Sequence, residues 1–83
     1  MPYVYILKCK DNTYYTGYTV DLERRLEEHR QGLASKYTRG RTPIELVYCE
    51  KASSKSEAMQ REWQIKKLTR VEKQGLIALQ GKS

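Results

Sequence analysis

The sequence predicts an α+β fold in which a small three-stranded antiparallel sheet is flanked by helices, in the order β-β-α-β-α-α. Three short runs rich in apolar residues and tyrosine, residues 3–9, 13–18 and 44–50, have the length and composition of strands. Stretches with helix-capping residues follow the second and third runs. The 83 residues are expected to form a single domain, residues 1–83, with a thin core, because so small a domain buries only about 60–65% of its surface.

The first two runs are expected to pair as a hairpin. Asp11 and Asn12 separate them, and both residues tolerate the left-handed backbone that a tight turn demands. Residues 3–9 are nearly all apolar without alternation, which is typical of a central strand covered on both faces. Gly17 ends the second run, where the backbone either has a positive φ or is approached closely by another group.

Alternation within the third run predicts two faces of a strand. One face carries Ile44, Leu46 and Tyr48, and the other carries Glu45, Val47 and Cys49.

A helix is expected to begin at Thr19, which can serve as its N-cap, and to run to about Gln31. Gly32 then provides the C-terminal stop. The following residues 34–42 are polar and show no apolar period, so they are interpreted as a loop.

The apolar stripe of this first helix contains Leu22 and Leu26. His29 falls inside the stripe and Arg25 falls on its edge, four residues before His29. These two residues, which could both take part in a reaction, are therefore expected to lie together where the buried face of the helix meets solvent.

Two further helices are predicted by capping boxes, in which a Ser or Thr and a Glu three residues later satisfy each other's amides. The first box, residues 54–57, opens a helix to about Leu68, and the second, residues 69–72, opens a last helix that frays at Gly81.

The composition favours a polyanionic partner. Sixteen Lys and Arg against ten Asp and Glu give a net charge of +6, which suits nucleic acid, although solubility alone would also explain it. The longest apolar run is residues 3–7, while a membrane span needs about 20 residues, so no membrane partner is expected. Without a secretory leader, the expected location is the cytoplasm.

Cysteine usage fits that location. Cys9 and Cys49 lie in two predicted strands and are interpreted as free buried thiols, with a disulfide left open. Two unclustered cysteines and the one histidine do not make a structural zinc site, which needs about four ligands. The sequence has seven Tyr and no Phe, which suggests that the tyrosine hydroxyl groups have a role beyond filling the core.

Glu62 is the sharpest candidate for chemistry, because it lies between apolar neighbours on its helix and a carboxylate rarely occupies such a position without a partner. It can ligate Mg²⁺, which is commonly held by one or two carboxylates and takes the rest of its shell from water and phosphate. The alternative is an ion pair with Lys66, four residues later in the favoured order.

The other candidates also have two interpretations. Arg25 can bind a phosphate through its planar guanidinium, or form a surface ion pair with Asp21 or Glu28. His29 can donate to a phosphate oxygen or move a proton near neutral pH, or be a satisfied histidine on a half-buried face. The remaining candidates, taken alone, are core aromatics: Tyr5 and Tyr15.

Lys36, Arg39 and Arg41 lie in the polar loop together with an aromatic residue. This pattern suits a clamp on a nucleic-acid backbone, and a solvated loop is the alternative.

The motif Tyr3-Val4-Tyr5, followed by Tyr15-Thr16-Gly17, Arg25 and the distant helix residue Glu62, resembles the GIY-YIG endonuclease domain over essentially the whole chain. Residues 22–26, 36–40 and 61–62 are similar to segments of the small stand-alone bacterial proteins of this type. The resemblance implies the same sheet-and-helix fold and one-metal hydrolysis of a DNA phosphodiester.

By position, the resemblance implies a role for each site residue. Tyr5 matches the tyrosine that acts as general base or orients the water, and Tyr15 matches the one that contacts the phosphate or the metal-bound water. Arg25 matches the arginine that steadies phosphate charge, and Glu62 matches the protein metal ligand. His29 matches a position held by histidine or tyrosine in relatives.

Three positions depart from the family pattern. Tyr3 replaces the glycine of the first motif, and Thr16 replaces the isoleucine of the second. Tyr18 stands where the nucleotide-excision-repair relatives have a lysine, so that positive contact is missing or comes from another residue such as Lys66.

The sequence therefore predicts a metal-dependent DNA endonuclease that is structure-directed or weakly sequence-specific, acts in DNA repair or processing, and uses Mg²⁺, with Mn²⁺ as a possible substitute. No small-molecule cofactor is expected, and the chain is expected to be a monomer or a weak homodimer. The rival hypothesis is a non-catalytic or partner-dependent nucleic-acid-binding module on the same fold.

Overall fold

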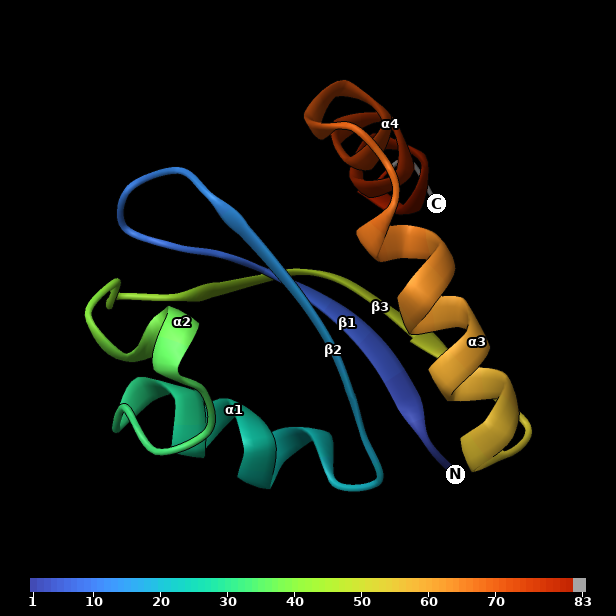
Figure 1. Ribbon diagram of the computed structural model, residues 1–83, viewed down its shortest axis with the longest axis horizontal. Coiled ribbons are helices and arrows are strands. Elements are labelled where there is room, and N and C mark those ends of the chain that lie inside the picture. The colour runs from blue at the N-terminus through green and yellow to red at the C-terminus, as the bar shows by residue number, and fades with distance from the viewer. Residues whose placement is uncertain (82–83) are drawn as a thin grey trace.

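The structure is a computed structural model that describes residues 1–81, and its helices lie on either side of one sheet (Figure 1). The sheet is antiparallel with the order β2-β1-β3, and is formed by β1 (Tyr3–Lys8), β2 (Tyr14–Thr19) and β3 (Glu45–Lys51). One side carries α1 (Leu22–Arg30) and α2 (Lys36–Arg39), and the other carries α3 (Lys55–Lys66) and α4 (Arg70–Gly81). The predicted fold class and order of elements are confirmed, with α2 as an added short helix. None of the helices described is both long and apolar enough to span a membrane.

β1 is the central strand, as its composition predicted. Its side chains alternate between the two faces of the sheet, so Val4 and Ile6 pack toward α3 and α4 while Tyr5 and Leu7 pack toward α1. All four side chains are 0–1% exposed. The strand therefore reads as a continuous apolar run because both of its faces are covered.

The hairpin between β1 and β2 also agrees with the prediction. Asn12 has a φ of 66°, in the left-handed region, and the Cys9 amide donates to the Thr13 carbonyl at 2.9 Å across the turn. Cys9 and Cys49 are both free thiols.

The predicted alternation along the third strand is wrong. The pairing of β1 with β3 shifts between Ile6, which faces Tyr48, and Leu7, which faces Leu46, so Val47 is an extra residue. Such a bulge resets the alternation. Ile44 consequently packs on the α1 side, whereas Val47 and Tyr48 both pack on the α3 side.

α1 begins two residues later than predicted. Its N-cap is Asp21, whose Oδ1 accepts from the Arg24 amide at 3.1 Å, and not Thr19. Thr19 is the last residue of β2, and its hydroxyl instead accepts from the Asp21 amide at 3.2 Å. The predicted stop is confirmed, because Gly32 has a φ of 77°, which a side chain would strain.

The segment interpreted as a polar loop contains α2. Ser35 caps this short helix by accepting from the Tyr37 amide at 3.1 Å, and Gly40 ends it. A four-residue helix has no room for an apolar period, so the pattern that reveals longer helices was absent.

The second predicted capping box forms in full, and the first forms in part, because its glutamate accepts from Ser53 and not from the Ser54 amide. Ser54 Oγ accepts from the Glu57 amide at 3.1 Å, while the Glu57 carboxylate accepts from the amide and hydroxyl of Ser53. Thr69 and Glu72 satisfy each other reciprocally, at 2.8 Å and 3.2 Å. The boxes fix the starts of α3 and α4 and so the placement of both helices beside the sheet.

Candidate active site

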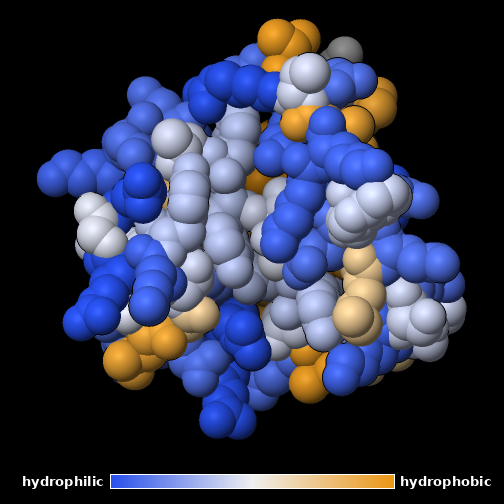
Figure 2. All heavy atoms as spheres, viewed as in Figure 1, coloured by the Kyte–Doolittle hydropathy of each residue, from blue (hydrophilic) through white to orange (hydrophobic). Residues whose placement is uncertain are grey.

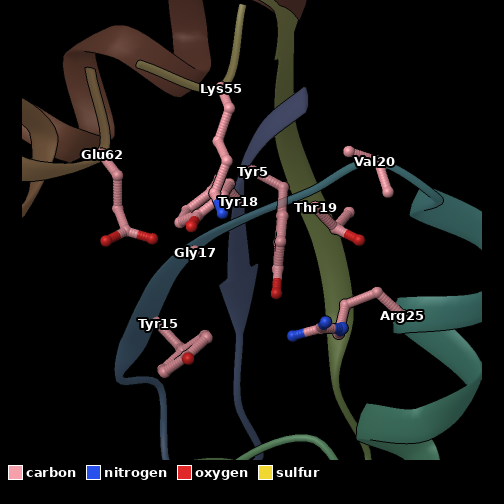
Figure 3. Close-up of a pocket in the computed structure, with 9 residues that line it drawn as sticks. All are labelled: Tyr5, Tyr15, Gly17, Tyr18, Thr19, Val20, Arg25, Lys55 and Glu62. Atoms are coloured by element: carbon pink, nitrogen blue, oxygen red, sulfur yellow. The ribbon is translucent and has the colours of Figure 1, made fainter. Parts of the chain in front are cut away.

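The candidate site is a cleft of about 390 Å³ between α1 and α3, over β1 and β2 (Figure 3). It is lined by Tyr5, Tyr15, Gly17, Tyr18, Thr19, Val20, Arg25, Lys55 and Glu62. In the space-filling view, a strip of near-neutral hydropathy runs between strongly hydrophilic groups of side chains on the two sides (Figure 2). Tyr5, Tyr15, Arg25 and Glu62, which are far apart in sequence, thus share one cleft.

Gly17 makes the floor of the cleft possible. It pairs with Tyr5 across the strands, and a Cβ on Gly17 would lie 2.7 Å from the Tyr5 hydroxyl oxygen. Real Cβ contacts are never that short, so only glycine lets the Tyr5 ring lie across β2. The sequence left two reasons for a glycine here, a positive φ or the close approach of another group. The φ of Gly17 is not positive, so the close approach of Tyr5 is the reason.

Tyr5 is hydrogen-bonded on its buried side to His29. The Tyr5 hydroxyl and His29 Nε2 are 2.9 Å apart, and His29 Nδ1 is 2.8 Å from the Thr38 hydroxyl. His29 is 0% exposed and both its ring nitrogens have partners. Of the interpretations left open for His29, this geometry favours a histidine whose ring is satisfied inside the protein over one that donates to a phosphate oxygen. Its expected position at the solvent boundary is corrected, because it lies behind Tyr5.

Burial sets the protonation of this pair. It raises the pKa of Tyr5 above the ordinary 10.0, with Tyr15 adding to the rise and Arg25 partly offsetting it. It lowers the pKa of His29 below the ordinary 6.5, and the positive charge of Arg25 acts in the same direction. At neutral pH Tyr5 is thus a phenol and His29 a neutral imidazole.

The charged residues of the cleft form the ion pairs that the sequence offered as alternatives. Arg25 Nε lies 3.1 Å from Glu28 Oε1, and Lys66 Nζ lies 3.4 Å from Glu62 Oε1. Arg25 and Lys66 are 39% and 52% exposed, and exposed pairs of this kind contribute at most about 1 kcal/mol. Neither pair prevents Arg25 or Glu62 from engaging a ligand in the cleft.

Lys55 is a cleft residue that sequence reasoning missed. It is the first residue of α3 and extends toward Tyr18 over the cleft, on the same side as Glu62 (Figure 3). A sequence signal existed, because Lys55 and Glu62 are seven positions apart, about two helical turns, and so share a face of α3. Lys66, by contrast, is not among the residues that line the cleft.

The basic residues of the predicted backbone clamp lie on and just after α2. Lys36 and Arg39 are exposed, whereas Arg41 Nε is 3.0 Å from Asp11 Oδ2 and its guanidinium lies 4.2 Å from the Tyr37 ring centroid. The Tyr37 ring is in turn 5.8 Å from that of Tyr15, so this segment adjoins the cleft.

The donor set of the cleft fits magnesium better than a metal with several protein ligands. Glu62 is the carboxylate that lines it, with 21% of its side chain exposed. Among residues 1–81, no three His, Cys, Asp or Glu side chains are placed to surround an ion. Mg²⁺ tolerates such a site, because it keeps several waters and shares phosphate oxygens with its substrate.

Comparison with known proteins identifies the family. The GIY-YIG catalytic domain model matches residues 1–75. A UPF0213 protein of Natronomonas pharaonis is 59% identical over 76 residues, covering 92% of this chain and 89% of the relative, and one of Halobacterium salinarum is 55% identical over 77 residues, covering 93% and 100%. The solution structure of a UPF0213 protein from Bacillus halodurans is similar with a TM-score of 0.63 at 50% identity, covering 98% of this chain and 87% of that one. A protein from E. faecalis gives a TM-score of 0.65 at 40% identity, covering 98% and 86%. With a nuclease-type motif pair whose tyrosines meet in one cleft and relatives matched over nearly their full length, this chain belongs to the GIY-YIG catalytic domain family.

Proposed function

We propose that this protein is a Mg²⁺-dependent DNA endonuclease that hydrolyses phosphodiester bonds by a one-metal mechanism. Tyr5, Arg25 and Glu62 come from β1, α1 and α3 and all face one cleft, and this convergence is the main support. The membership of a nuclease-type family and the net charge of +6 point to the same substrate class.

Glu62 is the residue that would hold the ion. Bound Mg²⁺ supplies the positive charge that polarises the phosphate and stabilises the leaving oxygen. Mn²⁺ has similar ligand preferences and should substitute for it.

Tyr5 and His29 form a path for the proton of the attacking water. Because its raised pKa keeps Tyr5 a phenol, the residue does not begin as a phenolate base. Its oxygen accepts a proton from water while its own proton passes to His29 Nε2, 2.9 Å away. The water oxygen then forms a bond to phosphorus as one P–O ester bond breaks, and the leaving oxygen takes a proton from bulk water to become an alcohol.

The remaining residues bind and orient the strand. Arg25, 39% exposed at the cleft wall, pairs with the phosphate, and the Tyr15 hydroxyl orients the phosphate or the water. The segment with Lys36, Arg39 and Arg41 contacts the backbone further along the strand. In this proposal these groups bind phosphate oxygens and not base edges. Because phosphate contacts carry no sequence information, this suits a structure-directed or weakly sequence-specific nuclease in DNA repair or processing.

The test is cleavage of supercoiled plasmid and of branched and flapped DNA, with Mg²⁺ and with Mn²⁺, by the wild type and Glu62→Gln. We expect the substitution to abolish cleavage and keep DNA binding. The matched control is Glu27→Gln, which removes one carboxylate from the exposed face of α1 and should cleave like the wild type.

Equal cleavage by the wild type and Glu62→Gln would refute the assignment of the metal ligand. DNA binding without cleavage by the wild type, in either metal, would instead support the rival hypothesis of a binding module or of a required partner protein.

A further inference from the structure

His29 is held between two hydroxyl groups in the interior. On one side is the Tyr5 hydroxyl, at 2.9 Å from Nε2, and on the other is the Thr38 hydroxyl, at 2.8 Å from Nδ1. His29 and Thr38 are both 0% exposed. Solvent therefore takes no part in deciding which ring nitrogen carries the proton.

A third contact gives this chain of hydrogen bonds a direction. Thr38 Oγ1 lies 3.4 Å from the Ser35 carbonyl oxygen, which can only accept. Thr38 has one hydrogen to donate, and when that hydrogen goes to the Ser35 carbonyl, Thr38 accepts from His29 Nδ1–H. His29 Nε2 then carries a lone pair and accepts from the Tyr5 hydroxyl. The reverse direction would forfeit the bond between Thr38 and Ser35.

We propose that Thr38 is a positioning residue that holds His29 in the Nδ1–H tautomer, so that Nε2 is available to receive the Tyr5 proton during hydrolysis. The inference rests on the proposed function for its catalytic consequence, while the tautomer itself is a property of the free protein.

The short helix α2 holds the Thr38 hydroxyl in place beside His29. The Ser35 carbonyl also accepts from the Arg39 amide at 3.1 Å, and the Ser35 side chain caps the helix, so Thr38 is held within a single turn. From other elements, Tyr5 of β1, Thr38 of α2 and Tyr15 of β2 face the His29 ring, with 5.2 Å between the ring centroids of Tyr15 and His29. On its own helix, the charged residues Arg25 and Glu28 act on the ring electrostatically. Burial and Arg25 keep the ring neutral, which is the state in which a tautomer is defined.

The first test is nuclear magnetic resonance of the imidazole nitrogens, which distinguishes the two tautomers. His29 is the one histidine in the sequence, so its signals need no assignment by mutation. We expect the Nδ1–H tautomer in the wild type and in Thr38→Ser, and a shift toward Nε2–H in Thr38→Val. An Nε2–H tautomer in the wild type would overturn the inference, whether or not any variant folds.

The second test is the rate of cleavage at saturating DNA. Thr38→Val should lower kcat about tenfold to a hundredfold with little change in KM, because proton transfer is impaired and DNA contacts are not. Thr38→Ser should restore the rate, and Thr42→Val, a matched change outside the cleft, should leave it unchanged.

The outcomes separate the two hypotheses. If the wild type cleaves and Thr38→Val keeps both its tautomer and its rate, the inference about Thr38 fails and the nuclease function stands. If the wild type cleaves no substrate but the tautomer changes with Thr38, the hydrolytic function fails while the control of the His29 tautomer is upheld.

Discussion

Thr16 carries a buried hydroxyl that has no hydrogen-bond partner among residues 1–81. The residue is 3% exposed and sits in β2 opposite Ile6, on the face where Tyr14 and Tyr18 pack against the α3 side of the core. Replacing the hydroxyl with a methyl group removes the cost of burying an unpaired polar group. We expect Thr16→Val to raise the free energy of unfolding by about 1 kcal/mol, measured by urea denaturation.

Thr19→Val is the control for that prediction. Thr19 is equally a buried threonine of β2, but its hydroxyl accepts from the Asp21 amide at 3.2 Å. The same chemical change should therefore lower stability at this position. A loss of stability in Thr16→Val would mean that the Thr16 hydroxyl has a partner in solution.

At the scale of elements, α3 holds both a carboxylate and an ammonium group over the cleft. The helix is fixed to the sheet by Arg61, whose Nε donates to both carboxylate oxygens of Glu50 at 2.9 Å and 3.0 Å, with the Tyr48 hydroxyl donating to the same carboxylate. Glu62 follows Arg61 directly, so this contact also fixes the orientation of the candidate metal ligand.

Lys55 should act in the cleft as a phosphate-binding residue. It forms no ion pair with any residue that the structure describes, and a cation at the start of a helix opposes the helix dipole, so helix stability does not explain its position. We expect Lys55→Met to lower the rate of cleavage about tenfold, measured under single-turnover conditions. Lys51→Met removes the same charge from an exposed site outside the cleft and should have little effect. Equal losses in both variants would attribute the effect to net charge alone.

The elements that the sequence predicted are those fixed by local chemistry. The Asn12 turn, the Gly32 stop and the helix caps at Ser54 and Thr69 each depend on a few adjacent residues, so the pattern sufficed. The two features that it missed leave no such local pattern, because a bulge depends on the partner strand and α2 is too short for an apolar period. The bulge at Val47 exists only against β1, and α2 is tied to the fold through Thr38 and His29.

The candidate site, like the fold, was predictable from the sequence only in part. The spacing of the motifs identified Tyr5, Tyr15, Arg25 and Glu62 as residues that share the cleft, because the hairpin and two helix faces determine their placement, but it did not identify Lys55. The full burial of His29 was not predictable, since its wheel position reports a face of α1 and not what covers that face. The covering residue, Thr38, lies on the element that the pattern did not reveal.

At the scale of the whole molecule, the net charge of +6 is not evenly available to DNA. Arg41 is paired with Asp11, and Arg61 is paired with Glu50. Lys36 and Arg39 are exposed on α2 and form no ion pair within the described part of the chain. Lys36 and Arg39 are therefore free to displace counterions from DNA, and their helix adjoins the cleft through the contact between Tyr37 and Tyr15.

This distribution predicts unequal effects within the basic segment. Arg39→Met should weaken DNA binding and reduce the slope of log K against log salt by about one, because each neutralised phosphate contributes about 0.9 to that slope. Arg41→Met should change the slope less, because Arg41 is already ion-paired with Asp11 and its guanidinium lies over the Tyr37 ring. It should instead lower stability, because Asp11 loses its ion-pair partner and the Tyr37 carbonyl loses the hydrogen bond from Arg41. The measurement is fluorescence anisotropy with labelled DNA between about 50 and 200 mM salt, in Glu62→Gln so that no strand is cut. An unchanged slope in Arg39→Met would show that α2 does not contact the DNA backbone, and DNA would then have to enter the cleft from the α3 side alone.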